Sequence, residues 1–164
     1  MNNGAVEVLG WFDRQSWDMG RKVGMCFPFI KMTDGKWELE SLNDIPKERL
    51  NGYGNIVDGN VVWWNWTMNV DYEENTIDLI NISVSHREMG LGSFFMNVLC
   101  RLCDYHQVSI RIPSIKPFGI KLINGKRKLY KKELLKWYRS FGFKIDYQNS
   151  SGFRVPKEKE IENE

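Results

Sequence analysis

Apolar and polar residues alternate along much of the first half of the chain, which is typical of β-strands. Two such runs, Met25–Met32 and Lys36–Leu42, flank an Asp-Gly pair beginning at Asp34, and this pair supplies the positive φ of a tight hairpin. The apolar residues of Trp11–Gly20 show no clear period, so this segment could form either a short helix or a loop. The segment Ile45–Leu50 predicts one helical turn.

A second hairpin is predicted where Asn55–Val57 leads through Asp58 and Gly59 into the tryptophan-rich run Asn60–Val70. A polar turn follows, and the apolar positions of Thr76–Ser85 then predict a largely buried strand. The chain up to this point therefore predicts strands that are joined by hairpins.

After this strand, the period of the apolar residues changes from two residues to 3.6 residues. Apolar residues recur on one face from Leu91 to about His106, which predicts an amphipathic helix packed on the sheet. The next apolar run, Val108–Ile112, predicts another strand. A strand–helix–strand crossover joins parallel strands and is almost always right-handed.

The last part of the chain predicts a second helix and a closing hairpin. The helix is expected at Lys128–Phe141, and Gly142 ends it in the manner of a C-cap. The hairpin is expected from Phe143–Tyr147 and Phe153–Val155, which a polar turn separates.

Length and composition predict one globular domain. We place it at residues 1–156, followed by a charged tail at residues 157–164 that we expect to fray. Hydrophobic residues make up 42% and charged residues 27%, which excludes disordered and fibrous classes. The net charge of +2 is too small to require a polyanionic partner.

The expected setting is soluble and cytoplasmic. No apolar run approaches the roughly 20 residues that a membrane span needs. The chain has three cysteines, and Cys100 and Cys103 lie on the apolar side of the first predicted helix, which favours a reducing compartment.

The main chemical signal lies between the apolar strand and the helix that follows it. The sequence there reads His86-Arg87-Glu88-Met89-Gly90-Leu91-Gly92-Ser93. A helix that begins after Gly-x-Gly presents unpaired backbone N–H groups and the positive end of its dipole, and glycine lets an anion approach the chain. The segment therefore predicts a phosphate-binding loop.

The same segment has other interpretations. Gly-x-Gly is also typical of a plain strand-to-helix turn. A dinucleotide-binding Rossmann loop is disfavoured because Arg87 stands where the first glycine belongs, and a P-loop is disfavoured because Gly-Lys-Ser/Thr is absent.

Two segments together resemble a known family. Arg87, Gly90 and Gly92 form an Arg-x-x-Gly-x-Gly pattern that resembles the acyl-CoA pyrophosphate signature of the GNAT N-acetyltransferases. The segment Trp137–Phe143 resembles the family's Tyr-x-x-x-Gly-Phe signature. Both occur in the family's order and at about its spacing, and the resemblance covers about residues 55–155.

This resemblance implies an α+β fold of the α/β/α type, with a mixed, mostly antiparallel sheet splayed at its centre and helices on both faces. It implies acetyl-CoA as cosubstrate and no metal. The pantetheine arm would pair with the strand backbone at Asn81–Ser85 by strand addition, and one backbone N–H would polarise the thioester carbonyl. The residues that the resemblance assigns to the cosubstrate are Ile82, Ser83, Val84, Arg87, Glu88, Met89, Gly90, Leu91, Gly92 and Ser93.

The resemblance also implies a reaction, in which a neutral primary amine attacks the thioester directly in a ternary complex. Tyr138 matches the tyrosine that protonates the departing CoA thiolate, although it also suits a core position with its hydroxyl satisfied nearby. Asp78 is the candidate general base, and Glu73 and Glu74 are alternative candidates. Each of the three could also be an ordinary surface carboxylate. His86 is expected to orient the loop or to lie at its rim, with no role in proton transfer.

The sequence departs from the family pattern at two positions. Lys131 stands where the family often has an asparagine that holds the cofactor, and Glu88 replaces a glycine or small basic residue. These departures keep open a second hypothesis, a CoA-binding or inhibitory module without turnover.

A third hypothesis is a nucleic-acid-modifying member of the same fold. It is prompted by the basic cluster Lys126–Lys128 and by Trp63, Trp64 and Trp66, but a solvated helix face and a sheet core are favoured for them. The expected partners are therefore acetyl-CoA and an amine acceptor, either a small molecule or a protein lysine. Nucleic acid is not favoured, no membrane is expected, and the chain is expected to be a monomer or a homodimer.

Overall fold

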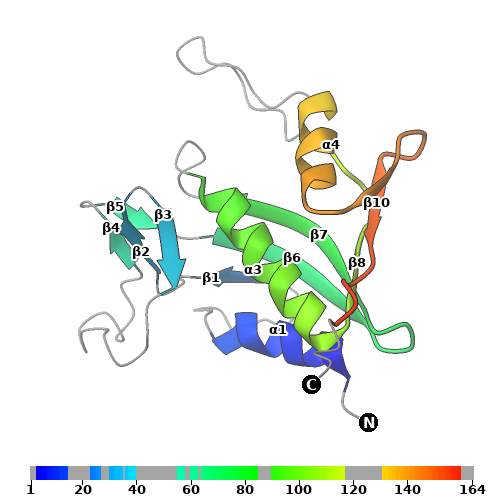
Figure 1. Ribbon diagram of the computed structural model, residues 1–164, viewed down its shortest axis with the longest axis horizontal. Helices are drawn as coiled ribbons and strands as arrows, with labels where there is room; N and C mark the ends of the chain where they lie inside the picture. Colours follow the sequence, from blue (N-terminus) through cyan, green and yellow to red (C-terminus); the bar gives the residue numbers. More distant parts are fainter. Residues whose placement is uncertain are drawn as a thin grey trace.

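The structure is a computed structural model that describes residues 3–14, 23–26, 30–34, 36–39, 55–57, 60–62, 64–84, 90–116 and 131–159. Its elements are α1 (Gly4–Arg14), β1 (Val23–Cys26), β2 (Ile30–Thr33), β3 (Lys36–Leu39), β4 (Asn55–Val57), β5 (Asn60–Val62), β6 (Trp64–Asp71), β7 (Thr76–Val84), α3 (Leu91–His106), β8 (Ser109–Ile112), α4 (Lys131–Ser140), β9 (Lys144–Asp146) and β10 (Ser151–Arg154) (Figure 1).

Six strands form the main sheet, in the order β1-β6-β7-β8-β10-β9. Only the pair β7 and β8 is parallel, and α3 connects these two strands. The sheet is therefore mixed and mostly antiparallel, as predicted. The pairs β2–β3 and β4–β5 form two separate hairpins, which lie to one side of the sheet in Figure 1.

The strands β7 and β8 are joined over only three residue pairs, which begin at Thr76 with Ser109 and end at Asp78 with Arg111. Beyond Asp78, residues 79–84 of β7 remain paired with β6 on one edge, but no described strand pairs with their other edge. The sheet therefore opens between β7 and β8.

A β-bulge in β7 lies at the start of this opening. Asn81 pairs with Thr67 and Leu79 pairs with Met68, so that Ile80 is an extra residue in β7. Such a bulge bends its strand and increases the local twist. The bulge therefore bends β7 close to the point where its pairing with β8 ends.

The core lies between the sheet and the helices α1 and α3. The ring of Phe12 on α1 contacts Trp66 of β6 at 6.2 Å and Phe95 of α3 at 5.3 Å between centroids. The fully buried large side chains are Trp66, Phe12, Phe95, Met68, Ile77, Leu79, Leu91, Met96, Leu99 and Ile110. The side-chain sulfurs of Cys100 and Cys103 are free and buried in the same core, as the sequence predicted.

The helix α1 begins at Gly4, whereas the sequence pattern had left only Trp11–Gly20 open between helix and loop. The amide of its second residue, Ala5, donates to the side-chain oxygens of Asn3 and Asn75 at 3.0 and 2.9 Å. A Cβ at Gly4 would lie 2.5 Å from a backbone oxygen of α3, so only glycine permits this approach.

Two predicted strands are divided in the structure. The run Asn60–Val70 becomes β5, which pairs with β4, and β6, which joins the main sheet. The run Met25–Met32 becomes β1 on β6 and β2 in the first hairpin. The predicted turn at Ile45–Leu50 lies outside the described residues.

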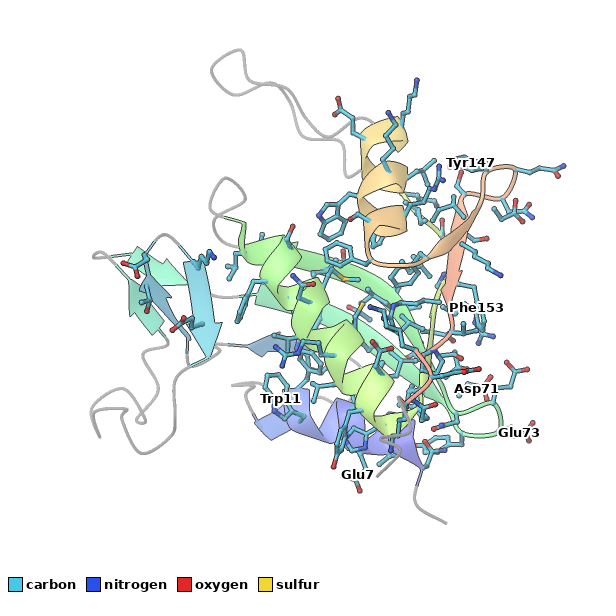
Figure 2. All side chains as sticks on the ribbon, in the orientation of Figure 1. Glu7, Trp11, Asp71, Glu73, Tyr147 and Phe153 are labelled. Atoms are coloured by element: carbon cyan, nitrogen blue, oxygen red, sulfur yellow. The ribbon has the colours of Figure 1, made fainter. Side chains whose placement is uncertain are left out.

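Arg154 of β10 shows which face of the sheet the helices cover. Its Nη1 and Nη2 donate to Asp104 of α3, and its Nε donates to the carbonyl of Phe141 just after α4. Phe153 points to the opposite face and is 40% exposed (Figure 2). In the described part of the chain α1, α3 and α4 lie on one face, whereas helices were predicted on both.

The first residue of the predicted tail is held to α3. The backbone N–H of Lys157 donates to Asp104, and its carbonyl accepts from the side chain of Gln107. No helix in the described ranges has both the length and the apolar character to cross a membrane.

Candidate functional site

A cavity of about 410 Å³ lies where β7 and β8 part. One wall is the free stretch of β7, residues 79–84, and the facing wall is the end of β8 with the residues after it, Ile112, Ser114, Ile115 and Lys116. The start of α3 and the residues Leu134, Trp137 and Tyr138 of α4 complete the lining. Three predicted cosubstrate residues, Ile82, Ser83 and Val84, are thereby brought together in one wall.

The first turn of α3 contributes backbone N–H groups. Gly90 precedes the helix with φ 74° and ψ 15°, a left-handed conformation that glycine adopts without strain. The first backbone bond of the helix runs from the amide of Phe94 to the carbonyl of Gly90, and no side chain caps this end. The amides of residues 91–93 therefore have no acceptor within the helix.

The predicted loop residues divide into three groups. Gly90, Gly92 and Ser93 line the cavity, whereas the side chain of Leu91 is fully buried in the core. Arg87, Glu88 and Met89 lie outside the described residues, together with His86.

Tyr138 lies in the cavity wall. It is 7% exposed, and its ring packs edge-on against Trp137 and Phe143 at 5.0 and 5.7 Å. Burial raises the pKa of its hydroxyl to about 12, because the charged phenolate would be poorly solvated there. Within the described ranges the hydroxyl has no hydrogen-bond partner, so it is a free donor at neutral pH.

Trp137 joins α4 to the start of α3. Its indole Nε1 donates to the hydroxyl oxygen of Ser93 at 3.0 Å, and its ring lies 3.8 Å from the position that a Cβ would take at Gly92. The sequence placed Trp137 in the second predicted helix and at the start of the segment Trp137–Phe143, and it predicted no hydrogen-bond partner for it. A buried tryptophan usually finds a partner for its N–H, but the sequence does not say which one.

The structure does not bring Asp78 to the cavity. Its two carboxylate oxygens accept from Nε and Nη2 of Arg111 at 2.6 and 3.1 Å. Glu73 and Glu74 lie in the turn before β7, and Glu74 is 3.5 Å from the same arginine. Figure 2 labels Glu73 at this turn, at the far end of the strand from α4. No carboxylate or imidazole lines the cavity in the described part of the chain.

The aromatic and basic segments are placed only in part. Trp66 is 1% exposed and lies in the sheet core, as the favoured interpretation predicted. Trp63 and the cluster Lys126–Lys128 lie outside the described residues, as does the side chain of Lys131. Among the described side chains no group of three or more His, Cys, Asp or Glu is arranged to hold a metal ion.

The chain was compared with known proteins. No family model matches it, and no curated protein matches it.

Proposed function

We propose that this chain is an acyl-CoA-dependent N-acyltransferase of the GNAT type, which transfers an acetyl group from acetyl-CoA to a primary amine. The observation that carries the proposal is the opening between β7 and β8, with a cavity along the edge of residues 79–84 that no described strand pairs with. The first turn of α3 and the residue Tyr138 border the same cavity.

The cavity suits an extended thioester that ends in phosphates. An unpaired strand edge offers alternating N–H and C=O groups, which an amide-containing chain such as pantetheine can pair with as an added strand. The amides of residues 91–93, which have no acceptor within α3, and the positive end of the α3 dipole favour a phosphate at the other end. A volume of about 410 Å³ also falls in the ordinary range for small-molecule sites.

The proposed reaction is direct acyl transfer. The neutral amine nitrogen attacks the thioester carbonyl carbon, an N–C bond forms, and the C–S bond then breaks to release CoA thiolate. A backbone N–H on the free edge of β7 stabilises the oxyanion of the tetrahedral intermediate. We assign no residue to the removal of the proton from the amine, since the described lining holds no carboxylate or imidazole.

Tyr138 is the proposed proton donor to the sulfur. A phenol with a pKa of about 12 keeps its proton throughout the neutral range. Burial also raises the pKa of the CoA thiol, because a poorly solvated sulfur anion is destabilised in the cavity. The hydroxyl can therefore donate as the C–S bond breaks and regain its proton from solvent.

A CoA-binding module without turnover is the second candidate. It is favoured by one observation, the lack of a carboxylate or imidazole in the described lining. The two candidates make the same prediction for CoA binding and opposite predictions for product formation.

The test is calorimetric titration with CoA, followed by thiol release from acetyl-CoA with a panel of primary amines. Gly92→Glu places a negative charge at the first turn of α3, and a Cβ there makes only ordinary contacts. We expect it to weaken CoA binding at least tenfold through repulsion of the phosphates. Asn97→Glu, which adds the same charge at an exposed position of α3, should leave affinity within about twofold.

Three outcomes are distinct. Binding with thiol release supports the transferase. Binding without release for any amine supports the module. Unchanged affinity in the Gly92→Glu variant, or no binding of CoA by the wild type, contradicts both candidates.

A further inference from the structure

The hydrogen bond between Trp137 and Ser93 links two parts of the cavity. The proposed function assigns phosphate binding to one part and proton donation to the other. Ser93 belongs to the first turn of α3, where the phosphates would lie, and Trp137 directly precedes Tyr138 on α4. Both residues line the cavity. A contact between them therefore couples the phosphate end of the site to the helix that carries the proposed acid.

The direction of this bond decides what Ser93 can do. Indole Nε1 is a donor only, so the hydroxyl oxygen of Ser93 must be the acceptor. A serine hydroxyl has one proton, and that proton is not used in the contact with Trp137. It is left to donate to an acceptor, and a serine near a helix N-terminus that lines a cavity can present it to an anion.

We propose that Trp137 is a positioning residue that holds the Ser93 hydroxyl as a hydrogen-bond donor to a phosphate of the acyl-CoA donor. This inference rests on the proposed function. Trp137 donates to Ser93, and its ring lies 3.8 Å from the position of a Cβ at Gly92, so its effect on the phosphates passes through the start of α3.

A purely structural role makes a different prediction. The ring of Trp137 also packs edge-on against Phe141 at 5.0 Å, and that contact stabilises α4 with no reference to a ligand. Trp137→Phe keeps an aromatic ring at this position and removes the indole N–H together with part of the packing surface of the larger ring. A structural role would lower thermal stability and weaken all ligands alike, whereas the positioning role acts on phosphate-bearing ligands alone.

The experiment is a double-mutant cycle on ligand affinity, with CoA and with pantetheine, which lacks the phosphates. Trp137→Phe should weaken CoA about threefold to tenfold, the usual range for one hydrogen bond, and leave pantetheine within about twofold. Ser93→Ala should weaken CoA about tenfold or more, and Ser93→Thr, which keeps the hydroxyl, should restore most of the affinity. In the Ser93→Ala background, Trp137→Phe should change CoA affinity less than about twofold.

The inference is overturned if Trp137→Phe weakens CoA equally with and without the Ser93 hydroxyl, or weakens pantetheine as much as CoA. Should Trp137→Phe fail to fold, the Ser93→Ala and Ser93→Thr pair decides alone, because equal affinity of these two for CoA removes the hydroxyl from the site. Failure of the wild type to bind CoA would instead overturn the proposed function. Additive effects in a protein that binds CoA and releases thiol would overturn only this inference.

Discussion

Asp78 and Arg111 form a two-point ion pair across the last residue pair that joins β7 to β8. Nε of Arg111 lies 2.6 Å from one carboxylate oxygen of Asp78, and Nη2 lies 3.1 Å from the other. Their backbones are also register partners, and beyond them the two strands part. The pair therefore holds the closed end of the opening that contains the cavity.

Asp78→Asn tests whether this carboxylate is a structural contact or a general base. We expect the free energy of unfolding to fall by about 1 kcal/mol or less, because the pair is partly exposed, and kcat to stay within about twofold. Loss of a general base would lower kcat by about 100-fold or more. Glu73→Gln, at an exposed position in the preceding turn, is the matched control for both measurements.

Tyr138→Phe tests the proposed proton donor. Removal of the hydroxyl should lower kcat by about 100-fold with acetyl-CoA, while the Kd for CoA stays within about threefold. Tyr105→Phe removes a hydroxyl from a tyrosine that is 71% exposed and should change neither value. An unaltered turnover in the Tyr138 variant would leave that hydroxyl with a packing role.

The buried hydroxyl of Tyr138 also affects stability at high pH. Its pKa is about 12 in the folded chain, against the ordinary value of 10.0, so the unfolded chain binds fewer protons between these values. The stabilisation is complete below pH 10 and is lost as pH rises towards 12. Between pH 10 and pH 11, the free energy of unfolding measured in urea should fall by about 1 kcal/mol less in Tyr138→Phe than in the wild type. Equal falls in the two proteins would contradict the burial of this hydroxyl.

Arg154 and Asp104 form a second ion pair that stabilises the described fold. The side chain of Arg154 is only 4% exposed, and it donates to both oxygens of Asp104. Arg154→Met should therefore cost about 3–5 kcal/mol of unfolding free energy, because the carboxylate loses its charged partner. Arg154→Met combined with Asp104→Leu should recover part of that loss, and a further fall in the double variant would contradict this assignment.

Acid should weaken the same pair. Burial alone would raise the pKa of Asp104, but hydrogen bonds from Arg154 and from the Lys157 amide outweigh it and lower that pKa. The resulting stabilisation is present above the ordinary carboxyl pKa of 3.8 and is lost as pH falls through the lower folded value. The Arg154→Met variant should lose less stability than the wild type over this acid range.

The sequence predicted the second half of the fold closely. Thr76–Ser85 corresponds to β7, the helix from Leu91 to His106 is α3, and Val108–Ile112 corresponds to β8. These segments have long, regular apolar patterns, and short connections fix their order. The helix predicted at Lys128–Phe141 is α4 from Lys131, with residues 117–130 outside the described ranges.

The first half was predicted less well, although one signal was present. Ala5, Val8, Leu9 and Phe12 have helical spacing and are all buried, so that α1 could have been recognised. The division of Asn60–Val70 between two sheets could not have been recognised from the sequence, because both parts suit a strand and only long-range pairing separates them. Pairing partners far apart in sequence are not encoded in a local period.

The same limit explains the candidate site. The Gly-x-Gly pattern located the start of α3 by local chemistry, and Gly90 and Gly92 do line the cavity. Asp78 appeared to be a suitable base because its strand carries the site, but its partner, Arg111, lies in a strand that pairs only after the crossover. The contact between Trp137 and Ser93 likewise joins residues 44 positions apart.

Amide hydrogen exchange tests most directly the central claim that an acyl-CoA donor lies along the free edge of β7. The outward amides of residues 79–84 have no strand partner in the described chain, so saturating acetyl-CoA should slow their exchange by about tenfold or more. Exchange in β10, which is paired with β8 and β9, should not change. Unchanged exchange at residues 79–84 in a protein saturated with acetyl-CoA would contradict the account.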